Sequence, residues 1–530
     1  MEYKNTYEKE YSTTTNKEHL HHLGQFFTPY YIAHLLAEWI TSVSKSDLTA
    51  LDPSAGFGVL PRAIEATKDR LCKIYYDLYE IDTNISPSLS QISKNDLNIE
   101  NTIFNEDFLL SPWDKKYDII IANPPYLKHQ KIANRKIIQA SFHEKTNRQF
   151  STALNLYSWF LIKSLFQLKE WGRIAFIIPK EFLNNNSNVL VRELLLTQNM
   201  NWHILSIKSK NRIFSEVLTT SILLLGEKTN TKGKVAFYSV ELTNTKTRLR
   251  DIMQSPINII DNNKIDPKIK WSNYLQKETN NNNMVPISLF GKFIRGIATG
   301  SNHFFLINTE TANKYNLQEN ALIPCVGKAR FVKGKIFNQD ALNELILNNK
   351  NVYLFNGNKD TTNYLKVGEN LKIPEKYLNK HRNPWYLQEK REPSKIWISV
   401  FTRKDFFKVC WNSTEAITLT AFHNFRPNSG FDDYQKILFL YLQTEIGQKN
   451  ISLEVRDYAN NLRKLEPNDL NQSYVYDFRK LQTAEKILLY KYFDIFLNHP
   501  EKEKEIINKV NFLFLELIRG KHITTTIELL

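Results

Sequence analysis

The amino-acid sequence predicts an α/β fold for the first half of the chain and a mixed α+β region with a helical C-terminal part for the second half. Between residues 50 and 126, four short apolar runs each end at a polar residue and alternate with other segments, as in a parallel sheet. An Asn- and Lys-rich stretch at 258–284 indicates a linker. From Phe431 onward, apolar residues recur at helical spacing. We therefore expect domains at 1–257 and 285–530.

Bulk composition bounds the class of protein. A chain of 530 residues is too long for one core, and 42% hydrophobic with 12% aromatic residues supply enough apolar surface for two or three. The 70 basic against 55 acidic residues give a net charge of +15, which favours a polyanionic partner, nucleic acid before membrane. The alternative is that this charge only keeps a large surface soluble.

Cysteines and apolar runs indicate the compartment. Cys72, Cys325 and Cys410 lie far apart without a CxxC pair, so we expect no disulfide framework, no metal site and a reducing cytoplasm. No apolar run approaches the roughly 18 residues of a membrane span, and the first residues lack the apolar region of a signal peptide. We expect a soluble protein.

The start of the chain predicts a helix or loosely held arm over 1–20, followed by a marked helix start. Thr28 suits an N-cap and Pro29 the first position of a helix running from Tyr30 to Val43, where apolar residues recur at helical spacing. The free N–H groups of such a start can hold a carboxylate, although an ordinary helix cap gives the same pattern.

A strand, a turn and a helix follow over residues 50–60. Asp52 and Pro53 stand at the strand's end, and Gly56 and Gly58 let the backbone approach a ligand closely. The spacing matches neither the dinucleotide nor the P-loop fingerprint. The sequence therefore predicts a ligand loop of another kind.

The next two strands end in acids. Glu80 follows the second strand, where α/β nucleotide folds bind ribose hydroxyls, and Asp107 precedes Phe108 after the third. Because the carboxyl ends of parallel strands meet at one edge of a sheet, these groups and Asp52 are expected to lie together.

The fourth strand, Ile119–Ala122, delivers the most informative stretch, Asn123-Pro124-Pro125-Tyr126. Two prolines stop the strand, and the Asn123 amide oxygen and the Pro124 carbonyl then face outward as two acceptors. Such a pair suits a planar –NH2 group, and Tyr126 offers a face on which a ring can stack. The alternative is a Pro-Pro turn with a core tyrosine.

Later segments complete the expected site. Residues 127–150 are polar and basic, which predicts a flexible loop over it. Phe214 stands in a turn between two apolar strands, where an exposed aromatic ring needs a reason, although a small satellite core would also explain it. In the second half, base-reading residues are not readable from the sequence; Arg382, Arg391 and Arg463 are candidates.

Together these motifs resemble those of the γ-class, TaqI-like adenine-N6 DNA methyltransferases of type II restriction–modification systems. The resemblance covers most of the chain, and the order of the motifs, cofactor before catalytic before recognition, is the γ arrangement. It is weaker in the second half, where it depends on segments 296–302, 384–391 and 462–467. Phe57 departs from many relatives, which carry a smaller residue there; we expect it to narrow the loop.

The resemblance implies a Rossmann-like catalytic domain that binds S-adenosylmethionine, and a target-recognition domain that binds double-stranded DNA. It implies that Thr28 and Pro29 position the cofactor's methionine end, that the loop from Asp52 and Pro53 to Gly58 binds the cofactor, and that Glu80 binds its ribose. The remaining implied residues are Asp107 and Phe108 for the cofactor's adenine, and Asn123, Pro124, Pro125, Tyr126 and Phe214 around the target base.

The implied reaction is direct methyl transfer to the N6 amine of a flipped-out adenine, which protects DNA from a separate cognate restriction endonuclease; a monomer suits an asymmetric site. Three rival functions stay open. Protein glutamine methyltransferases also use an Asn-Pro-Pro-Tyr site but lack a large C-terminal half, and the chain could also be an RNA adenine methyltransferase or a non-catalytic DNA-binding subunit. No metal is needed for the implied reaction.

Overall fold

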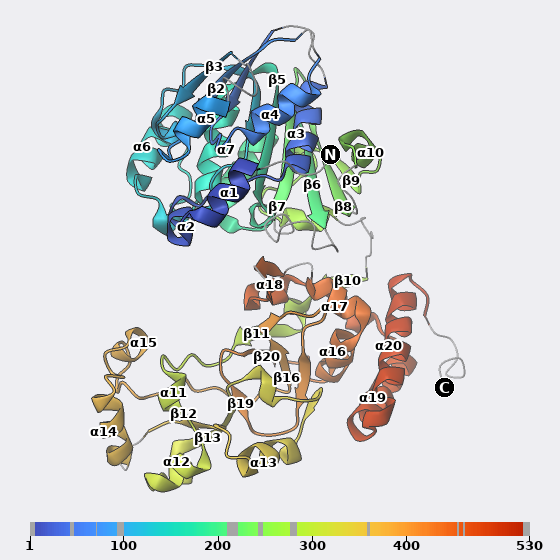
Figure 1. Ribbon diagram of the computed structural model, residues 1–530. Helices are drawn as coiled ribbons and strands as arrows, with labels where there is room; N and C mark the ends of the chain where they lie inside the picture. Colours follow the sequence, from blue (N-terminus) through green and yellow to red (C-terminus); the bar gives the residue numbers. More distant parts are fainter. Residues whose placement is uncertain are drawn as a thin grey trace. The chain divides into compact units, whose positions relative to one another are not determined.

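The computed structural model forms two compact units, Met1–Glu278 and Thr279–Leu530 (Figure 1). The structure describes residues 6–42, 47–69, 72–92, 100–208, 221–241, 247–275, 283–357, 361–452, 455–458 and 462–522.

One mixed sheet spans the first unit in the order β3-β2-β1-β4-β5-β7-β6-β8-β9. The first five of these strands run parallel, and β7 then pairs antiparallel with both β5 and β6. The predicted parallel α/β sheet is thus confirmed. In chain order the strands are β1 (Leu48–Asp52), β2 (Ile74–Tyr79), β3 (Glu100–Phe104), β4 (Tyr117–Ala122), β5 (Leu168–Pro179), β6 (Met200–Lys208), β7 (Ser221–Lys228), β8 (Lys234–Glu241) and β9 (Asn258–Asp261).

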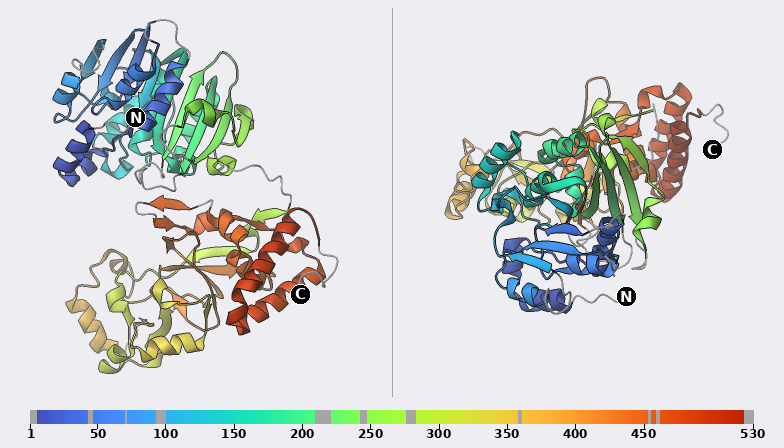
Figure 2. Two further views of the ribbon diagram at one scale, coloured as in Figure 1. Left: turned by 45° about the vertical axis from the view of Figure 1, so that its right-hand side comes forward. Right: turned by 90° about the horizontal axis from the view of Figure 1, so that it is seen from above.

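Helices cover both faces of this sheet, as the views in Figures 1 and 2 show. They are α1 (Thr6–Thr14), α2 (Lys17–Leu23), α3 (Tyr30–Thr41), α4 (Val59–Thr67), α5 (Ser86–Ile92), α6 (Arg135–Thr146), α7 (Leu156–Gln167), α8 (Val189–Thr197) and α10 (Leu249–Met253). Alternate residues of β4 face the two layers: Ile120 packs into the cluster of α6–α8, whereas Ile119 and Ile121 pack into that of α3 and α4. Each fully buried isoleucine contributes roughly 1.5–3 kcal/mol.

The prediction of a flexible loop at 127–150 is wrong in part, because Arg135–Thr146 forms α6. Ile138 and Phe142 stand four residues apart on one face of that helix and are buried in the core, while the polar residues face outward. Two apolar anchors are too few to give a clear helical pattern in so polar a segment.

The linker predicted at 258–284 begins too early. Residues 258–261 form β9, which pairs with β8, and Trp271 is fully buried in the core of the first unit. The Asn and Lys residues that suggest a linker surround apolar side chains such as Ile260, which lies opposite Val235. The two units divide at Glu278.

The second unit is a mixed α+β structure with a helical C-terminal part, as predicted. Its largest sheet has the order β11-β20-β16-β18-β14, and a second has the order β12-β15-β13-β19. The strands are β10 (Met284–Pro286), β11 (Gly291–Arg295), β12 (Leu306–Ile307), β13 (Leu322–Val326), β14 (Ile336–Phe337), β15 (Tyr353–Phe355), β16 (Ile396–Ser399), β17 (Phe401–Thr402), β18 (Val409–Asn412), β19 (Ile417–Thr418), β20 (Phe422–Pro427), β21 (Arg456–Tyr458), β22 (Leu462–Lys464) and β23 (Tyr474–Tyr476).

The last helices of the second unit pack on its larger sheet around a core that includes Trp411, Phe439 and Phe493. The helices of this unit are α11 (Asn302–Phe305), α12 (Thr309–Lys314), α13 (Gln339–Leu347), α14 (Thr362–Asn370), α15 (Tyr377–Lys380), α16 (Tyr434–Gln443), α17 (Glu445–Ser452), α18 (Pro467–Gln472), α19 (Thr483–Asn498) and α20 (Glu503–Ile518). Among the described residues of both units, no helix is long and apolar enough to cross a membrane.

Candidate active site

The segments singled out in the first unit meet at the carboxyl edge of β1, β2 and β4. The Ser54 hydroxyl donates to the Asn123 carbonyl at 3.2 Å, which joins the turn after β1 to the turn after β4. The Gly56 N–H donates to Oε2 of Glu80 at 2.8 Å, which joins the same turn to the end of β2. Local strand patterns and the parallel sheet together bring these residues into one place.

Asn123 is held with its amide in one orientation. Its Nδ2 donates to the Phe26 carbonyl at 2.7 Å and to the Thr28 hydroxyl at 3.0 Å. Its Oδ1 is buried and has no hydrogen-bond partner among the described residues. Burying an acceptor without a donor costs roughly 1–3 kcal/mol. A ligand N–H that donates to this oxygen would remove that cost, so the site favours binding of such a group.

The Thr28 contact differs from the helix cap predicted for it. Helix α3 begins at Tyr30 with Pro29 in the cap position, and no side chain caps it. Thr28 is buried, and its hydroxyl faces Asn123 instead. The reason is that Asn123 brings a competing donor close to the hydroxyl, which no local pattern reveals.

Tyr126 is half-buried against aromatic neighbours. Its ring lies 5.5 Å from that of Phe26 and 6.5 Å from that of Tyr157, and its hydroxyl is 3.4 Å from the Ser221 hydroxyl. Burial raises the pKa of the phenol, so it stays protonated. Pro124 is buried beside it and Pro125 is half-buried, and the two end the strand after Ala122 as predicted.

The turn after β1 combines a buried acid with two glycines. Gly56 and Gly58 have φ of 54° and 72°, which side-chain-bearing residues rarely adopt. Asp52 is fully buried next to a buried Pro53; its Oδ1 accepts from the Ser54 N–H at 3.1 Å, while its Oδ2 lacks a partner among the described residues. Burial raises the pKa of this carboxyl to about 8.

Phe57 does not stand open in that turn. Its ring is 5% exposed and packs edge-on against the Tyr11 ring, with centroids 5.4 Å apart, and in a tilted arrangement against the Phe27 ring at 5.7 Å. The Phe57 ring thus joins the loop to the N-terminal segment, and the narrowing of the loop stays a prediction.

The turn after β2 carries Glu80 and an exposed apolar residue. The Glu80 carboxylate accepts from the N–H groups of Gly56 and Asp82, and burial raises its pKa. The next side chain, Ile81, is 55% exposed, so it presents an apolar face beside an acid. Sequence reasoning missed Ile81, although an isoleucine directly after a strand-end acid was a usable indication.

The turn after β3 is supported by a buried lysine. Asp107 accepts from the Leu109 N–H at 2.9 Å, and burial raises the pKa of its carboxyl. Phe108 is 2% exposed and packs against Tyr79 and Phe160, so its ring supports the turn from within the core. Lys163 Nζ donates to the Phe108 carbonyl and to the carbonyl and hydroxyl of Ser111.

Two further expectations concern the second aromatic residue and metal binding. Phe214 lies outside the described residues. Among the residues that the structure does describe, no three His, Cys, Asp or Glu side chains gather into a possible metal site.

In the second unit, Arg382 is engaged internally. Its guanidinium donates to the carbonyls of Ala298 and Thr299 and to the side chains of Asn379 and Gln388. These bonds from its two terminal nitrogens hold the 296–302 loop, and base reading by Arg382 stays a prediction.

The other two arginine candidates differ from Arg382. Arg391 pairs with Glu389 at 2.6 Å, and its Nε is buried without a partner among the described residues. Arg463 donates to the Asp405 carbonyl at 2.9 Å and lies over the Phe407 ring.

Two family models match the chain: one described as the Eco57I restriction-modification methylase over residues 55–214, and one described as the C-terminal domain of the type II methyltransferase M.Eco57I over residues 270–515. Among solved structures, the chain resembles the type IIL restriction-modification enzyme MmeI in complex with DNA, with a TM-score of 0.56 and 14% identity over 91% of this chain and 71% of that one. That likeness shows the fold.

Sequence relatives extend the match. The chain is 30% identical over 227 residues to the type II methyltransferase M.BsuBI of Bacillus subtilis, covering 39% of this chain and 44% of that protein. It is 33% identical over 524 residues to the type II methyltransferase M.AccI of Acinetobacter calcoaceticus, covering 96% of each. The chain therefore belongs to the Eco57I-like family of type II restriction–modification methyltransferases.

Proposed function

We propose that the chain methylates the N6 amine of an adenine flipped out of a double-stranded DNA site, with S-adenosylmethionine as the methyl donor, as a γ-class enzyme. The observation that carries this proposal is the Asn123 amide, whose nitrogen is tied down and whose buried oxygen lacks a donor among the described residues.

The Asn123 amide suits a weakly nucleophilic amine. The lone pair of an exocyclic amine is delocalised into the ring, and two acceptors on its N–H groups favour a tetrahedral nitrogen and stabilise the positive charge that develops there. Asn123 Oδ1 is one acceptor, and the Pro124 carbonyl is the other in this proposal. Because Phe26 and Thr28 both accept from Nδ2, they keep the amide from rotating its nitrogen toward the amine.

The residues at the sheet edge fit the cofactor. S-Adenosylmethionine, when bound, supplies a methyl group activated by a sulfonium. The buried Oδ2 of Asp52, which has no partner among the described residues, suits a cationic group of the cofactor, and Glu80 suits its ribose hydroxyls. Ile81 offers the apolar face that an adenine ring needs. In this assignment Asp107 contacts the adenine, and Thr28 with Pro29 positions the methionine end.

The base pocket is assigned to Tyr126 with Pro124, Pro125 and Phe214. Flipping an adenine out of a duplex costs a few kcal/mol. Stacking on an aromatic ring returns roughly 1–3 kcal/mol per base, so the half-buried Tyr126 ring offsets much of that cost.

The second unit is assigned to target recognition, and the net charge of +15 supports a duplex DNA partner. The proposal includes a monomer acting in the cytoplasm, and protection of host DNA against a separate cognate endonuclease. Residues 1–278 then form the catalytic domain.

The test is sequencing of modified bases in DNA from cells that express the chain, beside cells that express Asn123→Ala. We expect N6-methyladenine at one short sequence, absent in the variant. N4-methylcytosine would redirect the assignment of the base. Methylation confined to RNA or to protein glutamine, or no methylation, would overturn the proposal.

A further inference from the structure

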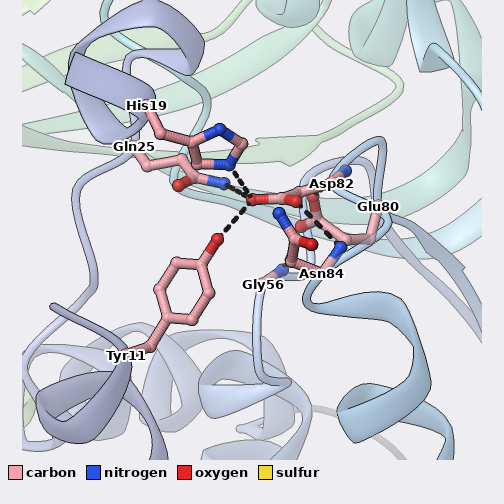
Figure 3. A network of polar contacts seen from close by, with 7 residues as sticks. All are labelled: Tyr11, His19, Gln25, Gly56, Glu80, Asp82 and Asn84. Atoms are coloured by element: carbon pink, nitrogen blue, oxygen red, sulfur yellow. Dashed lines mark hydrogen bonds and ion pairs between the residues drawn. The ribbon is translucent and has the colours of Figure 1, made fainter. Parts of the chain in front are cut away.

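One buried carboxylate joins the N-terminal helices α1 and α2 to the turn after β2. Oδ2 of Asp82 accepts hydrogen bonds from the Tyr11 hydroxyl at 2.7 Å, the Gln25 amide at 2.8 Å and Nε2 of His19 at 3.0 Å (Figure 3). Oδ1 accepts from the N–H of Asn84 at 3.0 Å. The side chain is 1% exposed, so both oxygens face protein groups.

The same turn is joined to the proposed cofactor loop. The Glu80 carboxylate accepts from the Asp82 N–H at 2.7 Å and from the Gly56 N–H at 2.8 Å. Figure 3 shows Glu80 and Gly56 beside the cluster around Asp82. The position of Asp82 is thus set by the groups proposed to bind the cofactor.

Gln25, which donates to Asp82, adjoins a residue that contacts the proposed base pocket. The preceding Gly24 carbonyl accepts the Tyr126 N–H at 3.1 Å. Gly24 has φ of 65°, and a Cβ on it would lie 2.8 Å from Cγ of Leu127, so the two segments approach as closely as glycine permits. The segment 24–28 then supplies the Phe26 and Thr28 contacts that orient Asn123.

We propose that Asp82 is a positioning residue that couples the cofactor pocket to the base pocket: by holding Gln25, it keeps segment 24–28 where that segment orients Asn123 and Tyr126. This inference rests on the proposed function, which assigns those pockets. Burial alone would raise the pKa of the Asp82 carboxyl, yet its three side-chain donors hold it below the ordinary value, so the carboxylate persists at neutral pH.

Helix α1 is also held by contacts that do not involve Asp82. The positioning role of Asp82 can therefore be tested apart from the packing of α1. Arg62 pairs with Glu8, and the Tyr7 ring lies 6.4 Å from that of Phe57. Tyr11 and Gln25 donate to the same Asp82 oxygen, but Gln25 adjoins Gly24 whereas Tyr11 lies on α1. Gln25→Ala and Tyr11→Phe therefore form a matched pair.

The first measurement is amide hydrogen exchange of the full chain without DNA or cofactor. Because Pro124 and Pro125 have no amide hydrogen, a peptide over 122–127 reports few positions, and Tyr126 dominates the change. We expect Asp82→Ala and Gln25→Ala to speed exchange there roughly 10-fold, while Tyr11→Phe speeds exchange in α1 and leaves this peptide as in the wild type. Equal behaviour of Gln25→Ala and Tyr11→Phe at this peptide would overturn the proposal.

The second measurement is methyl transfer from tritiated S-adenosylmethionine to unmodified phage DNA. We expect Asp82→Ala and Gln25→Ala to lower kcat roughly 10-fold with less than about 3-fold change in KM for the cofactor, as misplacement of a reacting group does. Asp82→Asn should restore part of the rate, because the Tyr11, His19 and Gln25 side chains can each reverse donor and acceptor roles. An unchanged kcat in both alanine variants would overturn the coupling.

The two measurements keep the proposals apart. If the wild-type chain transferred no methyl group to DNA, the proposed function would fail, while the exchange of the 122–127 peptide would still decide whether Asp82 positions that turn. If Asp82→Ala failed to fold, Gln25→Ala would carry both measurements.

Discussion

In the first unit, Asn123 holds a buried acceptor that has no donor among the described residues, whereas in the second unit Arg382 uses its donors on the surrounding loop. Both side chains are candidates for contact with DNA in the sequence analysis. This difference gives a criterion. A buried acceptor without a donor costs free energy and so indicates a ligand, whereas a guanidinium that donates to several oxygens of its own unit indicates a structural role.

The largest effect is expected for substitution of Asn123. Asn123→Ala should lower methyl transfer at least about 10²-fold, because it removes an acceptor that acts on the developing charge, while cofactor affinity stays nearly the same. Single-turnover transfer and equilibrium binding of the cofactor measure the two quantities. Asn199→Ala, at an exposed position of the same unit, serves as the control. Survival of turnover in Asn123→Ala would remove the catalytic role of this residue.

A smaller effect is expected for substitution of Arg382. Arg382→Ala should lower the free energy of unfolding of the second unit by about 1–3 kcal/mol, because the carbonyls of Ala298 and Thr299 lose a charged donor. Denaturant unfolding, monitored by amide hydrogen exchange in the 296–302 loop, measures this change in free energy. The exposed neighbour Lys380 gives the matched control, Lys380→Ala. If Arg382→Ala kept wild-type stability but lost DNA sequence preference, Arg382 would be a base reader after all.

The third expected effect concerns Asp52 and depends on pH. Burial raises its pKa to about 8, against about 3.9 in an unfolded chain. As pH rises from about 4 to about 8, the unfolded chain releases this proton and the folded chain keeps it, so the group's contribution to stability falls across that window. The Tm of Asp52→Asn relative to wild type should therefore increase from pH 5 to pH 8.

The same substitution should weaken cofactor binding, although it stabilises the fold at high pH. A carboxylate attracts a cationic ligand, so wild-type affinity for S-adenosylmethionine should rise with pH through about 8, and the variant should bind more weakly with a flatter profile. Calorimetric scans and binding titrations at matched pH measure both trends. Asp340→Asn, at an exposed position of the second unit, should show neither. Equal pH profiles for wild type and Asp52→Asn would show that Oδ2 of Asp52 does not face the cofactor.

Much of the site could be predicted because its residues follow strands. Asp52, Glu80 and Asn123 each stand at the end of an apolar run, and the parallel pairing of β1, β2 and β4 brings those ends together. The sequence did not reveal the side-chain partners. The Thr28 hydroxyl faces Asn123 while Pro29 takes the cap position of α3, and Arg382 donates to carbonyls of the 296–302 loop. Such partners come from other segments, so no local pattern announces them.

The sequence by itself determined the α/β order of the first unit, the helical end of the second, and the edge at which Asp52, Glu80 and Asn123 gather, because strand and turn preferences act over a few residues. Tertiary structure alone decided the rotation of the Asn123 amide and the cluster around Asp82, whose partners Gln25, His19 and Tyr11 stand 57, 63 and 71 residues away in the chain. Contacts at that separation depend on how the intervening segments fold, and hydrogen bonds tolerate displacements of only a few tenths of an ångström.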